Sequence, residues 1–206
     1  MFLWTDSYPV NYPAVSVVSE VRTFNWKSDQ GWFENQTTKI IIENYNEEGK
    51  IVSEELYHSG NILMEKTVYS YEENTVKKIT TNHENEIIRT ATITHEINTV
   101  TETVLLPDGM QLFKYISTIN NEGQITELKH LNRENDLLFL KKYTYTNRGD
   151  VESINLYNPD GSQAVLIDIE YDSFDEKGNW LVRSEYYTYS DVWGRPRDIV
   201  YRTIEY

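Results

Sequence analysis

The chain has 206 residues, with 33 Asp plus Glu against 19 Lys plus Arg and a formal net charge of −14 at pH 7. That charge repels a phosphate backbone and an anionic lipid surface, so neither nucleic acid nor an anionic membrane is an expected partner. The sequence contains no cysteine, which excludes disulfides, thiolate catalysis and Cys-based zinc sites.

No secretory signal is visible in the first residues of the sequence. Residues 1–15 lack a basic stretch followed by an apolar one, and no apolar run approaches the roughly 20 residues of a membrane-spanning helix. We therefore expect a cytoplasmic protein without a membrane span. If a leader is removed from the mature chain, the cell envelope or secretion is the alternative.

Residues 1–38 differ in pattern from the rest of the chain and contain one strand-like run, residues 14–24. In repeat architectures a terminal unit is often atypical because it covers an edge that would otherwise be exposed. We interpret 1–38 as an N-terminal cap segment and 39–206 as a β-hairpin repeat domain, together forming a single globular unit.

Residues from 39 onward contain turn residues at regular intervals. One series recurs every 24 to 29 residues and comprises Gly49, Asn74, Asn98, Gly123, Gly149 and Gly178. A second series, interleaved with the first, recurs every 24 to 26 residues and comprises Gly60, Asn85, Gly109, Asn135 and Gly161. Because Gly and Asn tolerate positive φ, this spacing predicts a repeating unit of two strands and two tight turns.

The segments between these turns are short and rich in β-branched and aromatic residues, and none has a helical period. They predict roughly a dozen antiparallel strands and no large helical domain. A sheet of that size curls as its twist accumulates, so we expect an all-β fold, a curved antiparallel meander of hairpins. The expected strands are 38–45, 51–57, 62–71, 87–95, 100–106, 110–119, 125–131, 137–145, 151–157, 164–171, 180–189 and 198–206.

Several turns pair an aromatic residue with the glycine four positions later, as in "YNEEGKI", "YTNRGDV", "YNPDGS" and "FDEKGNWLVR". This pattern resembles the YD repeats of Rhs-like bacterial proteins and their short relatives, over roughly residues 39–190. The resemblance implies a run of antiparallel hairpins. It assigns structural turn roles to Tyr45 with Gly49, Tyr145 with Gly149, Tyr157 with Gly161, and Phe174 with Gly178.

Tyrosines and tryptophans gather near strand ends, and such residues suit both sheets and binding interfaces. Cross-strand packing is enough to explain them. An exposed aromatic stripe would instead form an interaction surface for a peptide or a glycan. Its candidate residues are Tyr69, Tyr71, Tyr143, Trp180, Tyr187 and Tyr189.

The titratable residues do not form a catalytic pattern. His58 and His83 occupy similar places in successive units, which would put them about 9 to 10 Å apart, too far to share a metal ion. Carboxylates collect at the turns and are interpreted as a solvated edge, with a calcium-binding rim as the alternative. They are Glu47, Glu48, Glu72, Glu73, Glu122, Asp175 and Glu176.

No hydrolase or phosphate-binding motif is present in the sequence, so we predict a protein that is not an enzyme and needs no cofactor. Our first hypothesis is a protein-interaction module of a bacterial protein. Its acidity suits a basic protein partner, as in an immunity or inhibitor protein that neutralises a basic toxin. The alternative is a ligand carrier or glycan-binding sheet, whose strands would line a cavity with their apolar faces.

Overall fold

The computed structural model describes residues 14–27, 31–188 and 198–206, with the backbone alone described for 24–27 and 31–36. These residues form an all-β structure of fourteen strands. In chain order the strands are β1 (Ser16–Lys27), β2 (Gly31–Tyr45), β3 (Ile51–His58), β4 (Ile62–Glu72), β5 (Thr75–Asn82), β6 (Ile87–Glu96), β7 (Thr99–Leu105), β8 (Gln111–Ile119), β9 (Ile125–Leu131), β10 (Leu137–Tyr145), β11 (Val151–Tyr157), β12 (Gln163–Phe174), β13 (Trp180–Thr188) and β14 (Asp198–Glu205).

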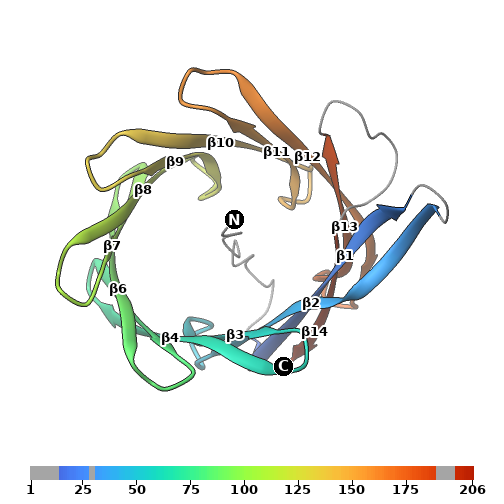
Figure 1. Ribbon diagram of the computed structural model, residues 1–206, viewed down its shortest axis with the longest axis horizontal. Helices are drawn as coiled ribbons and strands as arrows, with labels where there is room; N and C mark the ends of the chain where they lie inside the picture. Colours follow the sequence, from blue (N-terminus) through green and yellow to red (C-terminus); the bar gives the residue numbers. More distant parts are fainter. Residues whose placement is uncertain (1–13, 28–30, 189–197) are drawn as a thin grey trace.

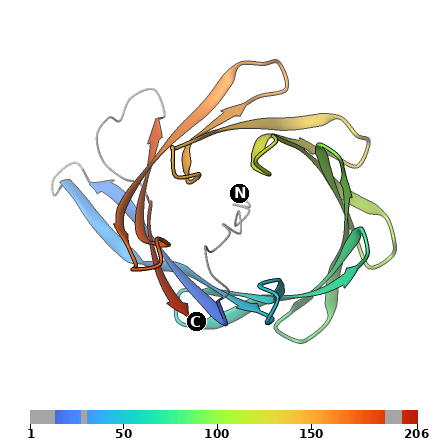
Figure 2. The same ribbon diagram turned by 180° about the vertical axis from the view of Figure 1, so that it is seen from behind.

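The strands close into a barrel because the first strand pairs with the last. β1 bonds to β2 on one side and to β14 on the other, from the Ser16–Glu205 pair to the Thr23–Asp198 pair. Figures 1 and 2 show the resulting ring end-on, with the blue β1 beside the red β14. The expected all-β antiparallel fold is confirmed. The expected open, curved meander of about a dozen strands is wrong, because the two ends of the sheet meet.

The structure differs from the sequence analysis in the assignment of the first residues and in one further strand. Residues 16–27 and 31–38, which the sequence analysis assigned to a terminal cap, are strand residues of the barrel wall. They join the ends of the sheet instead of covering a free edge, while residues 1–13 lie outside the described residues. The strand β5 was not among the expected strands, although it pairs with β4 and β6 along its whole length.

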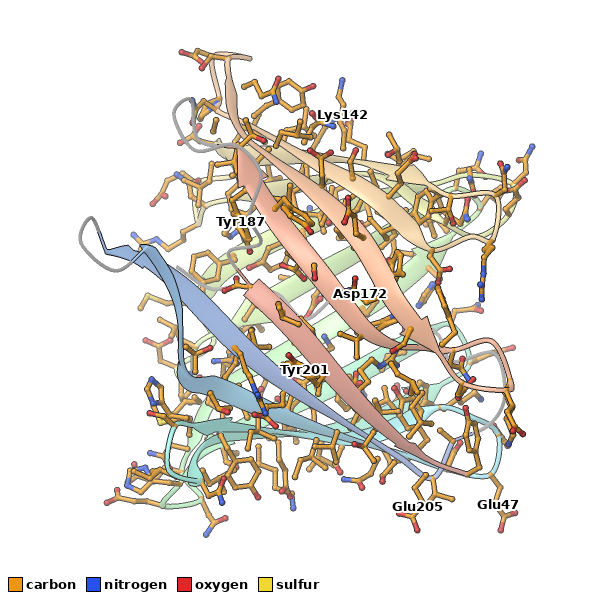
Figure 3. The ribbon with its side chains drawn as sticks, turned by 90° about the vertical axis from the view of Figure 1, so that its right-hand side faces the viewer. Glu47, Lys142, Asp172, Tyr187, Tyr201 and Glu205 are labelled. Atoms are coloured by element: carbon orange, nitrogen blue, oxygen red, sulfur yellow. The ribbon has the colours of Figure 1, made fainter. Side chains whose placement is uncertain are left out.

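The two series of turn residues mark the two ends of the barrel, because each strand runs opposite to the one before it. The turns at Gly49, Gly60, Gly109, Gly123, Gly149, Gly161 and Gly178 have φ between 73° and 88°. Asn85 and Asn135 also have positive φ, whereas Asn74 and Asn98 close shorter turns and are not among the positive-φ residues. Glu47, from the first series of turns, lies at the same end as Glu205 (Figure 3).

A side chain three positions before the glycine also shapes these turns. In the first hairpin turn Asn46 Oδ1 accepts hydrogen bonds from the backbone N–H groups of Glu48 and Lys50, at 3.0 and 2.9 Å. Asn120 makes the same pair of contacts in its own turn. Such bonds let Asn and Asp hold the backbone of a tight turn, so the repeated turn unit includes this position as well as the glycine.

Side chains alternate along each strand between a more buried and a more exposed face. On β10, Tyr143 is buried and Lys141 half-buried, while Lys142 and Thr144 between and beyond them are exposed. The register places Tyr143 opposite the buried Ile154 of β11. We call the face that carries Tyr143 and its register partners around the ring the inner wall, and the opposite face the outer wall.

Tyrosine hydroxyls connect neighbouring hairpins at one end of the barrel. Tyr71, Tyr145 and Tyr171 each donate a hydrogen bond to the backbone carbonyl 20 residues earlier in the chain, at 2.7, 2.7 and 2.9 Å. The acceptors are Ile51, Ile125 and Val151, each of which begins the strand after a glycine turn. The repeat thus has a side-chain link of its own in addition to the strand ladder.

A search of the described residues for membrane-spanning helices found none of sufficient length and apolarity.

Candidate binding site on the inner wall

One half of the ring carries an apolar inner wall. Its buried members come from the strands β6 to β12 and form one contact cluster, which comprises Ala91, Val104, Tyr115, Leu128, Tyr143, Val151, Ile154 and Ile169. Half-buried side chains pack against the cluster, among them Phe113, Phe139 and Tyr145. This half of the inner wall therefore presents apolar and aromatic surface.

His130 lies within this apolar half and is surrounded by aromatic rings. Its imidazole stacks on the Tyr115 ring of β8 with a centroid distance of 4.5 Å. Phe113 and Phe139 approach it edge-on, at 4.9 and 4.6 Å. The strand β9 turns His130 to the inner wall because His130 shares the parity of the buried Leu128.

The imidazole of His130 is buried, with 9% of its surface exposed, and neither ring nitrogen has a hydrogen-bond partner among the described residues. Burial lowers the pKa of His130, and the positive charge of Lys141 lowers it further. The ring is therefore neutral near pH 7 and offers one N–H donor and one nitrogen acceptor. Both nitrogens are buried and lack a partner among the described residues, so the ring has unused capacity for hydrogen bonds.

Among the cations that the register places on the inner wall, Lys141 is the closest to this aromatic group. It faces Leu128 on one neighbouring strand and Leu156 on the other, and it is half-buried. Its place on β10 is diagonal to His130, because Phe139 is directly opposite the histidine. Diagonal neighbours in an antiparallel pair lie about 7 to 8 Å apart, within reach of long side chains.

The remaining strands, together with the adjoining β6 and β7, carry charged side chains on the inner wall, and we call this part the charged half. Its cations are matched by carboxylates. Lys78 pairs with Glu102 at 3.0 Å, and Arg183 pairs with Glu185 at 2.7 Å. Arg89 donates to Glu65 through Nη1 at 2.9 Å. Because these charges lie on one face of neighbouring strands, they compensate each other away from bulk water.

Glu43 is the most perturbed carboxylate of the charged half. It is 5% exposed, faces Glu54 across the β2–β3 pair, and its Oε1 has no hydrogen-bond partner among the described residues. Burial raises the pKa of Glu43 to about 7, and the negative charge of Glu54 adds to the rise. Arg202 and a hydrogen bond from Tyr45 act in the opposite direction. Glu43 thus titrates close to neutral pH.

The predicted aromatic interaction surface is not on the outside of the molecule. Tyr143, Trp180 and Tyr187 are buried, with 8%, 4% and 7% of their surface exposed. Tyr69 is half-buried on the inner wall, and only Tyr71 is exposed. Tyr189 lies outside the described residues. Cross-strand packing therefore accounts for the three buried residues, which lie on the face that barrel closure turns inward.

The aromatic residues assigned to turns have varied contacts. Tyr45 approaches Glu43, and Tyr145 bonds to the Ile125 carbonyl. The Phe174 ring lies under the guanidinium of Arg148, 3.8 Å from its centroid, and Lys142 lies over the Tyr157 ring at 5.4 Å. The aromatic residue of the turn motif therefore has no single packing role around the barrel.

The remaining titratable candidates of the sequence analysis are at the surface. His58, His83 and His95 are exposed, and the turn carboxylates are exposed except for the half-buried Asp175. In the described part of the chain, no three His, Asp or Glu side chains are grouped so that they could hold a metal ion. These residues remain separate from the inner-wall group.

Sequence reasoning missed the residues that now define the candidate site. It did not single out His130, Lys141 or Glu43. Their spacing from apolar residues could have revealed them. His130 follows Leu128 by two positions, and Glu43 lies two positions from Ile41 and from Tyr45. A period of two places such residues on the same face as apolar neighbours.

No family model matches the sequence, and no curated protein matches it. The resemblance to YD-repeat proteins thus stays a prediction from the turn motif. Among solved structures, the chain is similar to a protein of unknown function from Bacteroides fragilis, with 22% identity and a TM-score of 0.37, over 53% of this chain and 94% of that one.

Two further solved structures are similar over more of the chain. A porin-like protein from Bacteroides uniformis has 12% identity and a TM-score of 0.42, over 96% of this chain and 100% of that one. A DUF1329 family protein from Desulfovibrio piger has 8% identity and a TM-score of 0.32, over 95% and 87%. These TM-scores are too low for the likeness to carry an argument about function.

Proposed function

We propose that the protein is a carrier that binds a small, largely apolar molecule inside its barrel. The observation that supports this most is His130, whose two ring nitrogens are buried without hydrogen-bond partners inside a group of three aromatic rings. Leaving a buried polar group unsatisfied costs about 1 to 3 kcal/mol. A ligand that bonds to the imidazole while it covers the rings would recover that cost.

The size of the barrel supports the same function. Eight strands already enclose enough space for side chains or one small ligand, and larger barrels enclose more. By this relation, a barrel of fourteen strands is wide enough for a small ligand beside its inner-wall side chains. Phe113, Phe139 and Leu156 face this interior and are only half-buried, so their surface is accessible to a ligand.

The interaction module stays a prediction. Of its candidate surface residues, Tyr143, Trp180 and Tyr187 are buried on the inner wall. An acidic immunity or inhibitor protein with a basic partner stays a prediction that rests on net charge alone. A carrier function agrees with the prediction from the sequence that the protein is not an enzyme. It also gives a role to the residues that lie together on the inner wall.

The test measures binding of an uncharged apolar probe, and it uses a variant in which a larger side chain on the inner wall fills part of the interior. N-phenyl-1-naphthylamine fluorescence is titrated with the native protein, with Leu156→Trp, and with the matched control Asn155→Trp. Leu156 faces the inner wall and Asn155 the outer wall of the same strand. Circular dichroism establishes that each variant is folded.

We expect saturable binding to the native protein and to Asn155→Trp, and at least fivefold weaker binding to Leu156→Trp, because the larger ring occupies ligand space. Absence of saturable binding to the native protein would contradict the carrier. So would equal binding by the two tryptophan variants, since the probe would then lie outside the barrel.

A further inference from the structure

Lys141 differs from the other cations of the inner wall in its lack of a carboxylate partner among the described residues. Within the described residues, each other inner-wall cation has a carboxylate that pairs with it or acts on its charge. The pairs are Lys78 with Glu102, Arg89 with Glu65, Arg183 with Glu185, Arg202 with Glu43, and Lys39 with Glu185 and Asp198. Lys141 forms no ion pair or hydrogen bond with any described residue, and the group on which its charge acts is His130.

This arrangement is unusual for a lysine in apolar surroundings. Lys141 lies between Leu128 and Leu156 on the neighbouring strands, and its own strand carries Phe139 and Tyr143 on the same face. A charge removed from water is costly unless a counter-charge accompanies it. The carboxylates of the charged half already have cationic neighbours, so Lys141 is the described inner-wall cation whose counter-charge a ligand can supply.

From this juxtaposition we infer that the ligand carries one negative charge, and that Lys141 and His130 together bind its carboxylate while its apolar body lies along the aromatic half of the inner wall. The inference rests on the proposed carrier function and specifies the chemistry of its ligand. The ammonium of Lys141 supplies the charge and up to three donors, and the imidazole N–H of His130 supplies a directed one.

A single charge fits the site better than two. Lys141 is one cation, and His130 is held neutral beside it, so a monoanion balances the local charge. A phosphate monoester carries −1.5 to −2 near pH 7, which would leave part of its charge uncompensated in a wall that already holds several carboxylates. We therefore expect a long-chain or aromatic monocarboxylate, and we use dodecanoate as the probe.

The experiment measures displacement of N-phenyl-1-naphthylamine by dodecanoate, dodecan-1-ol and dodecyl phosphate at pH 7.5. The proteins are the native chain, Lys141→Met, which keeps an apolar stem of similar length, and the control Lys142→Met. Lys142 is the adjacent, exposed lysine on the outer wall, labelled in Figure 3. Thermal unfolding establishes that both variants are folded.

We expect dodecanoate to bind the native protein roughly tenfold more tightly than dodecan-1-ol, and Lys141→Met to abolish that difference without weakening the alcohol. Lys142→Met leaves all affinities unchanged. His130→Phe, which keeps the ring stack but removes the donor, also lowers dodecanoate affinity more than that of dodecan-1-ol.

The outcomes separate the two proposals. If dodecanoate and dodecan-1-ol bind equally and Lys141→Met changes neither, the carboxylate site is wrong while the carrier stands. If dodecyl phosphate binds more tightly than dodecanoate, the preference for a monoanion is wrong. If none of the compounds displaces the fluorescent probe, or the probe itself does not bind, the carrier fails and the inference fails with it.

Discussion

At the scale of single residues, most cations of the inner wall have a neighbour that compensates their charge, and Lys141 is the exception among the described residues. Trp180 illustrates the point, because the guanidinium groups of Arg202 and Arg183 lie over its ring, at 4.2 and 4.8 Å from the centroid. Cation–π contact of this kind is worth about 0.5 to 2 kcal/mol. The aromatic residues of the charged half thus help to hold its cations, while those of the apolar half surround a neutral imidazole.

The titration of Glu43 gives a prediction about stability. Its pKa rises from 4.5 to about 7 on folding, so the folded state binds more protons than the unfolded state between these values. Glu43 therefore costs stability as pH rises from about 4.5 to about 7. We expect Glu43→Gln to raise the free energy of unfolding at pH 8, by at most about 3 kcal/mol, and to have little effect at pH 4.5.

Urea unfolding at the two pH values measures this effect. The matched control is Glu55→Gln on the outer wall, where hydrogen bonds from Lys66 and Tyr57 lower the pKa of Glu55. That carboxylate contributes stability which is present above its unfolded pKa and lost as pH falls, so its replacement is expected to destabilise the protein at pH 8. A Glu43→Gln variant that is less stable than the native protein at pH 8 would contradict the assigned environment.

At the scale of elements, the hairpin is the repeating unit, and the tyrosine link ties one hairpin to the next. Tyr145 donates to the Ile125 carbonyl, which lies in the strand after the Gly123 turn. We expect Tyr145→Phe to lower the free energy of unfolding by about 1 kcal/mol, because it removes one hydrogen bond and leaves a half-buried carbonyl unpaired by the side chain.

Chemical denaturation compares this variant with Tyr157→Phe. Tyr157 is also a half-buried turn aromatic, and its recorded contact is between its ring and Lys142, which the substitution keeps. Tyr157→Phe is therefore expected to unfold within about 0.5 kcal/mol of the native protein. Equal loss in both variants would mean that the hydroxyl of Tyr145 does not link the hairpins.

Local chemistry explains which elements were predictable from the sequence. Turn glycines such as Gly123 and Gly149 have positive φ in the structure, and the strands between them carry the expected β-branched residues. The strand β5 was missed because its "TVKKITTN" sequence has few apolar residues, and its neighbours on both sides stabilise it instead. The sequence pattern of a turn also includes a residue such as Asn46, whose side chain accepts hydrogen bonds from the backbone of the turn.

At the scale of the whole molecule, closure is the feature that local patterns cannot reveal. The pair Ser16–Glu205 joins residues from opposite ends of the chain, and no periodicity within a strand indicates that they meet. Closure also decides which face is inside. Period two places His130 with Leu128 and Lys141 with Tyr143, but the sequence alone does not indicate that both pairs face a shared interior.

The barrel therefore brings residues of separate strands together on one inner surface. The apolar half spans β6 to β12, and the charged half extends from β13 across the closure to β7, so the two overlap on β6 and β7. An elongated monocarboxylate would place its apolar body along the first half and keep its charge at Lys141, away from the carboxylates of the second. Whether the ligand lies beside His130 inside the barrel can be measured at that residue.

The most direct measurement follows the imidazole resonances of the full chain by NMR during a titration with dodecanoate. The protein has four histidines, of which His58, His83 and His95 are exposed and His130 is buried on the inner wall. A His130→Phe variant assigns the buried resonance. We expect a saturable shift of the His130 signal, with the other three unchanged. Saturation of the protein without any change at His130 would contradict binding inside the barrel.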